Sequence, residues 1–174
     1  MRGGAQAQLL LCEDGQRRVV KFKNNPQHCR VLANELLATR LAEAIGLTVP
    51  KTAVVQVPAW LIESTPEMHI DLGRAKIPCE AGLQFGANDV GGLTLDDVMD
   101  YLLEPQLSKV CNLAEFAGIL ALDKWTGNVD GRQALFVPCL SGCHPHPLQV
   151  GVLPFSRVKF IVSRSSCGTC DPEQ

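Results

Sequence analysis

The sequence has no run of about 18 uncharged apolar residues, so we expect no membrane-spanning helix. It also lacks a basic excess, because its formal net charge is -2. This charge argues against non-specific binding to nucleic acid. The apolar stretch near its start, Leu9, Leu10 and Leu11, is followed at once by Cys12 and Glu13. That stretch is too short for the apolar core of a secretory signal. We therefore predict a cytoplasmic protein with neither a membrane nor a nucleic acid as partner.

Disulfide bonds are not expected, because eight cysteines without a secretory signal do not predict a disulfide framework. Four of them are scattered and are expected to pack as small apolar side chains or to remain thiols: Cys12, Cys29, Cys79 and Cys111. The other four crowd into the last quarter of the chain: Cys139, Cys143, Cys167 and Cys170. Hydrophobic residues make up 46% of the 174 residues and charged residues 20%, which fits one globular domain.

The first 60 residues carry clear signals for local structure. Strands are predicted at residues 7–12 and 17–23, and the Asp14-Gly15 pair between them is typical of a tight hairpin. A helix is predicted at residues 29–45 and is ended by Gly46. A β-branched segment at 52–57 predicts a third strand. The apolar face of the helix is expected to contain Leu32, Ala33, Leu36, Leu37, Leu41, Ala44 and Ile45.

The pattern weakens at residues 58–92, where prolines and glycines predict loops and short turns. A helix is predicted at 94–103, and another runs from a capping-box-like start at 112–115 to about residue 125. Beyond residue 136 no pattern is sustained, apart from a candidate strand at 158–162. The inward face of the helix that follows residue 112 is expected to contain Leu113, Phe116, Ala117, Leu120, Ala121 and Lys124 or Trp125.

Three residues stand in the order that protein kinases use for their chemistry. A strand carries Lys21, the next helix carries Glu35, and a later loop carries Asp130. Each has a plain structural alternative, since Lys21 and Lys23 are both compatible with a solvated strand. Glu35 lies toward the polar side of its helix, and an aspartate before a glycine is by itself a turn signal. Their order favours a nucleotide site, and the alternatives stay open.

Parts of the sequence resemble the HipA-like kinase domains, over about residues 3–136. The strings that carry the resemblance are Val19-Val20-Lys21-Phe22-Lys23, Asn34-Glu35 through Gly46-Leu47-x-Val49-Pro50, and Asn128-x-Asp130-Gly131-Arg132-Gln133. The resemblance implies an α+β, protein-kinase-like fold. A small β-rich N-lobe would span about residues 1–60, and the start of an incomplete helical C-lobe would span about residues 93–136.

The resemblance also implies an ATP-dependent phosphotransferase that uses magnesium. Lys21 would contact the ATP phosphates and Glu35 would hold Lys21 by an ion pair. Asp130 would be the catalytic base, and Gln133 would lie in or near the metal and phosphate site. The phosphate acceptor stays open among protein, lipid head group and small molecule.

The sequence departs from the kinase pattern after Asp130. Kinase-type domains need a second acidic residue there to bind magnesium, and the only acids beyond residue 136 are Asp171 and Glu173. We therefore expect transfer to be impaired or absent. The Pro- and Cys-rich segment 137–174 reads as an atypical tail, and a frameshift near Phe136 is our hypothesis for it. The C-lobe helices that would complete the fold are then missing.

Two alternatives to a kinase domain remain. The first is a small interaction module stabilised by zinc, whose ligands would be Cys139, Cys143, Cys167 and Cys170. We expect ATP and magnesium rather than zinc, because the spacing of Cys139 and Cys143 is less usual for a zinc site. The second alternative is a remnant without catalytic activity.

Overall fold

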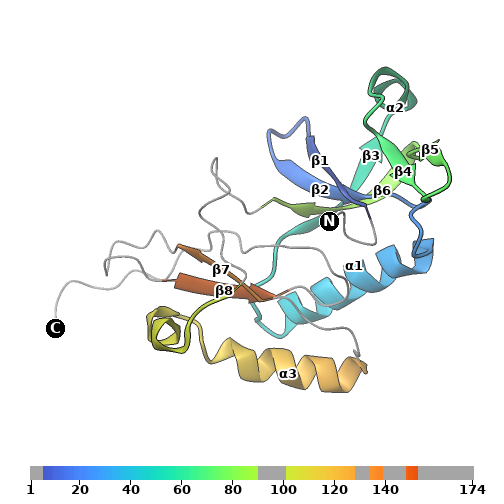
Figure 1. Ribbon diagram of the computed structural model, residues 1–174. Helices are drawn as coiled ribbons and strands as arrows, with labels where there is room; N and C mark the ends of the chain where they lie inside the picture. The colour runs from blue at the N-terminus through green and yellow to red at the C-terminus, as the bar shows by residue number, and fades with distance from the viewer. Residues whose placement is uncertain (1–5, 90–100, 128–133, 139–147, 153–174) are drawn as a thin grey trace.

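The computed structural model describes residues 6–89, 101–127, 134–138 and 148–152, and these residues form an α+β fold (Figure 1). Its first part contains β1 (Gln8–Leu11), β2 (Arg17–Lys21), α1 (Cys29–Ala44), β3 (Thr52–Val57), α2 (Ala59–Ser64), β4 (His69–Asp71), β5 (Lys76–Pro78) and β6 (Gly82–Asn88). Its second part contains the 3-10 helix η2 (Glu104–Lys109), α3 (Glu115–Thr126), β7 (Ala134–Pro138) and β8 (Leu148–Val152). Among the helices of these ranges, none has the length and apolar character needed to cross a membrane.

An antiparallel sheet in the order β1-β2-β6-β3 forms the centre of the first part. The β1–β2 turn closes as predicted: the Gly15 N–H donates to the Cys12 carbonyl at 2.9 Å, and Gly15 has a φ of 73°. A glycine suits this position because a left-handed backbone is costly for residues with a Cβ. The strand predicted at 52–57 is also confirmed as β3.

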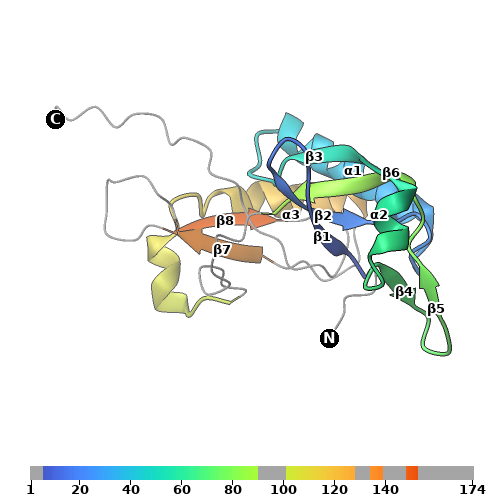
Figure 2. The same cartoon turned by 90° about the horizontal axis from the view of Figure 1, so that it is seen from above.

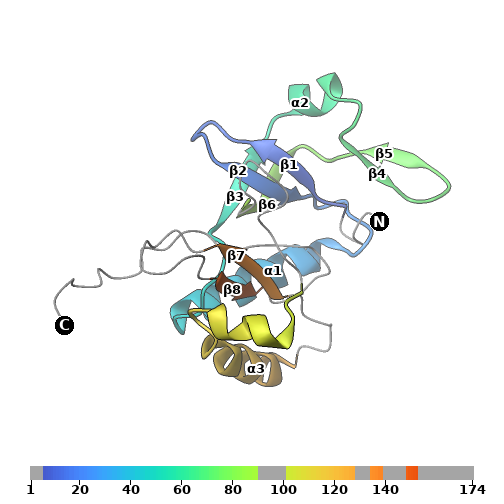
Figure 3. The same cartoon turned by 60° about the vertical axis from the view of Figure 1, so that its left-hand side comes forward.

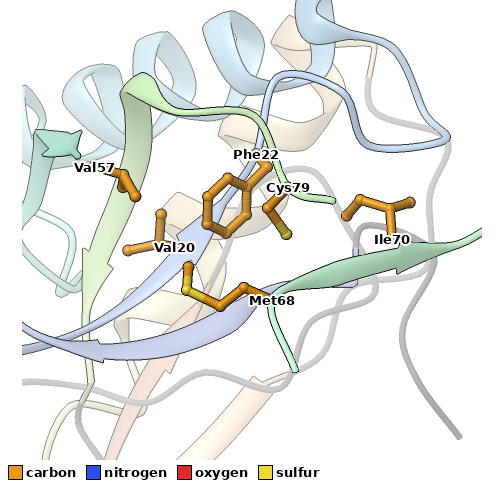
Figure 4. Close-up of a cluster of buried hydrophobic side chains, with 6 residues drawn as sticks. All are labelled: Val20, Phe22, Val57, Met68, Ile70 and Cys79. Atoms are coloured by element: carbon orange, nitrogen blue, oxygen red, sulfur yellow. The ribbon is translucent and has the colours of Figure 1, made fainter. Parts of the chain in front are cut away.

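Each face of the sheet is covered by different elements. One face packs with α2 and the β4–β5 hairpin around Val20, Phe22, Val57, Met68, Ile70 and Cys79, which point toward one another in Figure 4. The other face packs against α1 through Leu32, Phe85 and Ala87. The helix α1 lies between the sheet and α3 (Figure 1, Figure 3). The β4–β5 and β7–β8 hairpins lie at opposite ends of the molecule (Figure 2).

The prediction of loops and turns for residues 58–92 is wrong, because this segment supplies β6, which pairs with both β2 and β3. The strand β6 lies between two others and is buried on both faces at its centre, so its residues do not alternate between apolar and polar. A Cβ added at Gly86 would lie only 2.5 Å from Cγ2 of Val55. The glycine that argued against a strand is therefore required by its packing.

The helix α1 ends as predicted, but the prediction of its buried face is partly wrong. The Gly46 N–H donates to the Glu43 carbonyl at 3.0 Å, and Gly46 has a φ of 80°. Leu37 and Ile45, predicted to be inward, are 61% and 55% exposed. Small residues occupy most of its inner face, which consists of Leu32, Glu35, Ala38, Thr39 and Ala42.

The second part differs more from prediction. The helix α3 begins at Glu115 with Ala114 as an N-cap that makes no side-chain hydrogen bond, so the predicted capping box is wrong. Its buried residues are Ile119 and Leu122, whereas Leu120, predicted to be inward, is 68% exposed. The apolar residues of α3 lie on several faces, so their spacing did not single out the one that packs.

The segments on either side of α3 lie partly outside the described residues. Of the helix predicted at 94–103, residues 94–100 lie outside and residues 101–103 are not helical. In the tail predicted to lack a sustained pattern, β8 pairs antiparallel with β7, which corrects that prediction for residues 148–152. The candidate strand at 158–162 lies outside the described residues, and the extent of the two lobes stays a prediction.

Candidate functional site: a buried lysine–glutamate pair

Lys21 is the last residue of β2 and lies opposite Phe85 of β6, within the sheet. Side chains alternate along a strand, so Lys21 points away from its neighbours Val20 and Phe22, which form the core against α2. It therefore projects from the face that α1 covers. Only 3% of Lys21 is exposed, which is rare for a lysine and requires a partner for its charge.

That partner is Glu35, on the inner face of α1. The Lys21 Nζ donates to Glu35 Oε1 at 2.5 Å, and Glu35 is only 5% exposed. One turn later, the Thr39 hydroxyl donates to the Glu35 carbonyl at 2.7 Å. The structure thus contains the Lys21–Glu35 pair that the family resemblance implied. The alternatives of a solvated Lys21 and an exposed Glu35 are wrong.

Lys23, two residues along the chain, shows what an ordinary surface lysine of this segment looks like. Its side chain is 41% exposed and its Nζ lies 2.9 Å from Glu80 Oε1, which is also exposed. Such a pair contributes little to stability because water screens both charges. Lys21 and Lys23 looked alike in the sequence, and the structure separates a core ion pair from a surface one.

The electrostatics of the core pair reflect two opposing effects. Burial lowers the pKa of Lys21, because removing the ammonium from water disfavours its charged form. The charge of Glu35 and its hydrogen bond to Lys21 act in the opposite direction and favour the charged form. Ion pairs in a protein core are weak evidence for stability, because desolvation of both groups offsets their attraction. A titratable pair in such a place is a functional-site candidate.

Gln84 of β6 supports the segment that follows Lys21, and sequence reasoning missed it. Its Oε1 accepts the Lys23 backbone N–H at 2.8 Å, and its Nε2 donates to the Glu80 carbonyl at 2.5 Å. Gln84 is 2% exposed, so these bonds satisfy a buried amide. They fasten the chain just beyond Lys21 to the start of β6. A glutamine inside an apolar segment was the signal available, but the segment had been predicted as loop.

The remaining predicted site residues lie outside the described residues: Asp130, Gln133, Cys139, Cys143, Cys167 and Cys170. The helix α3 leads toward the first two, since it ends at Thr126 and Gly127 has a left-handed φ of 65°. Within the described ranges, no group of three or more His, Cys, Asp or Glu residues is arranged to hold a metal ion. The assignments of a catalytic base, a magnesium ligand and a zinc site therefore stay predictions.

Comparison with known families agrees with the resemblance drawn from the motifs. A family model described as HipA-like kinase matches residues 1–134, and the chain belongs to this family. The match begins before β1 and ends at the first residue of β7, so it spans Lys21, Glu35 and Asp130. No curated protein and no solved structure matches the chain.

Proposed function

We propose that this chain carries a kinase-like phosphotransferase domain that binds ATP with magnesium, and that its capacity for phosphoryl transfer is impaired. One observation supports this most directly, the buried ion pair between Lys21 of β2 and Glu35 of α1. Family membership adds the expectation of kinase-type chemistry. Nucleotide binding and its magnesium requirement are the parts that experiment must establish.

The chemistry of the pair suits a polyphosphate. A lysine ammonium carries three N–H donors and one positive charge, so it can hydrogen-bond to phosphate oxygens while Glu35 holds it in place. The amine is also held in place before the ligand arrives, because Lys21 ends a strand of the central sheet and pairs with Glu35 of α1. A preorganised donor loses little conformational entropy on binding, which favours affinity. Lys21 would therefore hold the phosphates and Glu35 would orient Lys21.

The transfer step itself would depend on residues that follow α3 in the sequence. Asp130 would accept the proton of the attacking hydroxyl as the oxygen bonds to the γ-phosphorus and ADP leaves. Gln133 would lie at the edge of the phosphate and metal site. Magnesium supplies charge neutralisation for the phosphates when it is bound. The acceptor would be a hydroxyl-bearing molecule: a protein, a lipid head group or a small molecule.

The proposed impairment follows from the acidic residues that come after Asp130. The next acids in the sequence are Asp171 and Glu173, and kinase-type transfer needs a metal-binding acid soon after the catalytic loop. Without it, less of the charge on the transferring phosphoryl group is neutralised. We expect nucleotide binding to persist through Lys21, with transfer slower by orders of magnitude than in a complete kinase site.

A thermal-shift titration with ATP and magnesium tests the proposal. At a ligand concentration of 100 times Kd, binding adds about 2.7 kcal/mol of stability. For a chain of this length that corresponds to a rise in Tm of about 5–10 °C. We expect Lys21→Ala to abolish the rise. Lys23→Ala, at the exposed lysine two residues away, should leave it unchanged.

Circular dichroism must first show that both variants retain a cooperative melt. An equal ATP-dependent shift in Lys21→Ala and the unmodified chain would remove Lys21 from the site. No shift in the unmodified chain, despite a cooperative melt, would refute nucleotide binding. A phosphoryl-transfer assay with labelled ATP then tests impairment separately, and turnover typical of kinases, about 1–100 per second, would contradict it.

A further inference from the structure

Glu115, the first residue of α3, makes a set of contacts that reach across 67 residues of sequence. Its Oε2 accepts the Thr48 backbone N–H at 2.6 Å, and its Oε1 accepts the Thr48 hydroxyl at 2.8 Å. The same Oε1 accepts a hydrogen bond from Asn112 Nδ2 at 3.1 Å. Hydrogen bonds to an ionised carboxylate are about twice as strong as those between neutral groups. One side chain therefore ties the start of α3 to the segment between α1 and β3.

Thr48 is in turn fixed to the end of α1. The Leu47 N–H donates to the Ala42 carbonyl at 2.9 Å, and the Gly46 N–H donates to the Glu43 carbonyl at 3.0 Å. This pair of bonds around a left-handed glycine is the Schellman motif, which closes a helix and holds the residues that follow it. A displacement of α1 therefore moves Thr48 with it.

A second contact lies one turn further along α3. A Cβ placed at Gly118 would lie 2.8 Å from Cδ2 of Leu47, so the backbone of α3 approaches that side chain closely. Residues 115 and 118 are neighbours on a helix surface, and the buried Ile119 and Leu122 continue the same stripe. The face of α3 that meets the end of α1 thus begins with Glu115.

We propose that Glu115 is a positioning residue for phosphoryl transfer, which holds the helix that carries Glu35 in a fixed orientation to the helix that leads to Asp130. This inference rests on the proposed function. Glu35 lies nine residues before the end of α1, about 14 Å along the helix axis. In the sequence, Asp130 follows the other end of α3, outside the described residues. The contact between Glu115 and Thr48, which we call the clamp, therefore joins the end of α1, which carries Glu35, to the start of α3, which precedes Asp130 in the sequence.

The coupling has a measurable consequence. If ATP binds Lys21, it restricts the motion of α1 through the ion pair with Glu35. The clamp then restricts the motion of α3 as well, so amide exchange along α3 slows when ATP binds. Removing the carboxylate should break this transmission while leaving the Lys21–Glu35 pair intact. If Glu115 merely stabilised the fold, its replacement would change the ATP-dependent slowing of amide exchange in α3 and in β2 alike.

Hydrogen exchange followed by mass spectrometry, with and without ATP and magnesium, tests the proposal on the whole chain. The variant is Glu115→Ala, and Glu43→Ala serves as control because Glu43 is an exposed carboxylate of α1 paired with Arg40. Without nucleotide, we expect the Thr48 amide to exchange at least about tenfold faster in Glu115→Ala only. ATP should slow amide exchange in β2 and α1 of all three proteins: the unmodified chain, Glu115→Ala and Glu43→Ala. In α3, ATP should slow exchange in the unmodified chain and in Glu43→Ala, but not in Glu115→Ala.

The outcomes separate this inference from the proposed function. ATP-dependent slowing of α3 that is equal in Glu115→Ala and the unmodified chain would overturn the inference, as would unchanged exchange of Thr48. If no protein responds to ATP, the proposed function fails and the Thr48 amide alone decides whether the clamp exists. Should Glu115→Ala not melt cooperatively, Thr48→Val removes only the hydroxyl half of the clamp. That variant should lose part of the α3 response, and an unaltered response would overturn the inference.

Discussion

Replacing Lys21 with methionine removes a charge from a place that water scarcely reaches. Lys21 is 3% exposed and Glu35 is 5% exposed, so the variant leaves a carboxylate with neither its ammonium partner nor bulk solvent. Removing one partner of such a buried pair costs about 3–5 kcal/mol. Methionine retains most of the apolar stem of lysine, so lost packing adds little. We expect the free energy of unfolding to fall by about 3–5 kcal/mol.

Urea denaturation followed by far-UV circular dichroism measures this loss. Fluorescence is less suitable, because Trp60 and Trp125 are 65% and 71% exposed and report poorly on the core.

Two control variants isolate the charge. Lys21→Met combined with Glu35→Met removes both charges and should recover most of the lost stability, because paired hydrophobic replacements of a buried ion pair are often neutral. Lys23→Met breaks only the surface pair with Glu80 and should cost at most about 1 kcal/mol. If Lys21→Met lost less than about 1 kcal/mol, or the double variant were as unstable as the single one, the buried pair would be refuted.

Two further predictions test the core, one by chemical modification and one by substitution. Burial raises the pKa of the Cys79 thiol to about 11, so at pH 8 only about one thiol in a thousand is ionised. Iodoacetamide should therefore modify Cys79 at least about 100-fold more slowly than the exposed Cys29, and comparable rates measured by mass spectrometry would contradict its burial. Gly86→Ala places a methyl group 2.5 Å from Val55 and should cost about 1–3 kcal/mol in urea denaturation. Adding Val55→Ala should restore part of that loss, and strictly additive losses would show that the two positions do not touch.

Local signals predicted the parts of the fold that depend on local chemistry. An aspartate and a glycine define the β1–β2 turn, and a glycine in the left-handed region ends α1. The turn and the helix end both depend on residues adjacent in sequence, so both can be predicted from the sequence alone. The strand β6 is different, because its role depends on β2 and β3 on either side. Its glycine is favourable only once the Val55 side chain is known to lie against it.

The candidate site shows the same division. Spacing and order placed Lys21, Glu35 and Asp130 in a kinase-like sequence, but no local pattern distinguished Lys21 from Lys23. Burial decides between the two lysines, and burial is a property of the assembled sheet and helix. Periodicity placed Glu35 toward the polar side of α1, because a charged residue is not expected to face a core. The family resemblance supplied the pairing that periodicity missed.

Two polar contacts connect α1, and the residue Thr48 just beyond its end, to neighbouring elements. Apart from Leu32, its fully buried residues are short or charged, and large side chains such as Leu37 and Ile45 face outward. Leu32 packs on Phe85 and Ala87 of β6, and polar contacts add to this apolar packing. The ion pair of Glu35 fixes the helix on one side, and beyond its end Thr48 fixes it to α3 through Glu115. Polar contacts need defined distances and angles, whereas apolar contacts tolerate sliding. A helix held in this way keeps a fixed position relative both to Lys21 and to the start of α3.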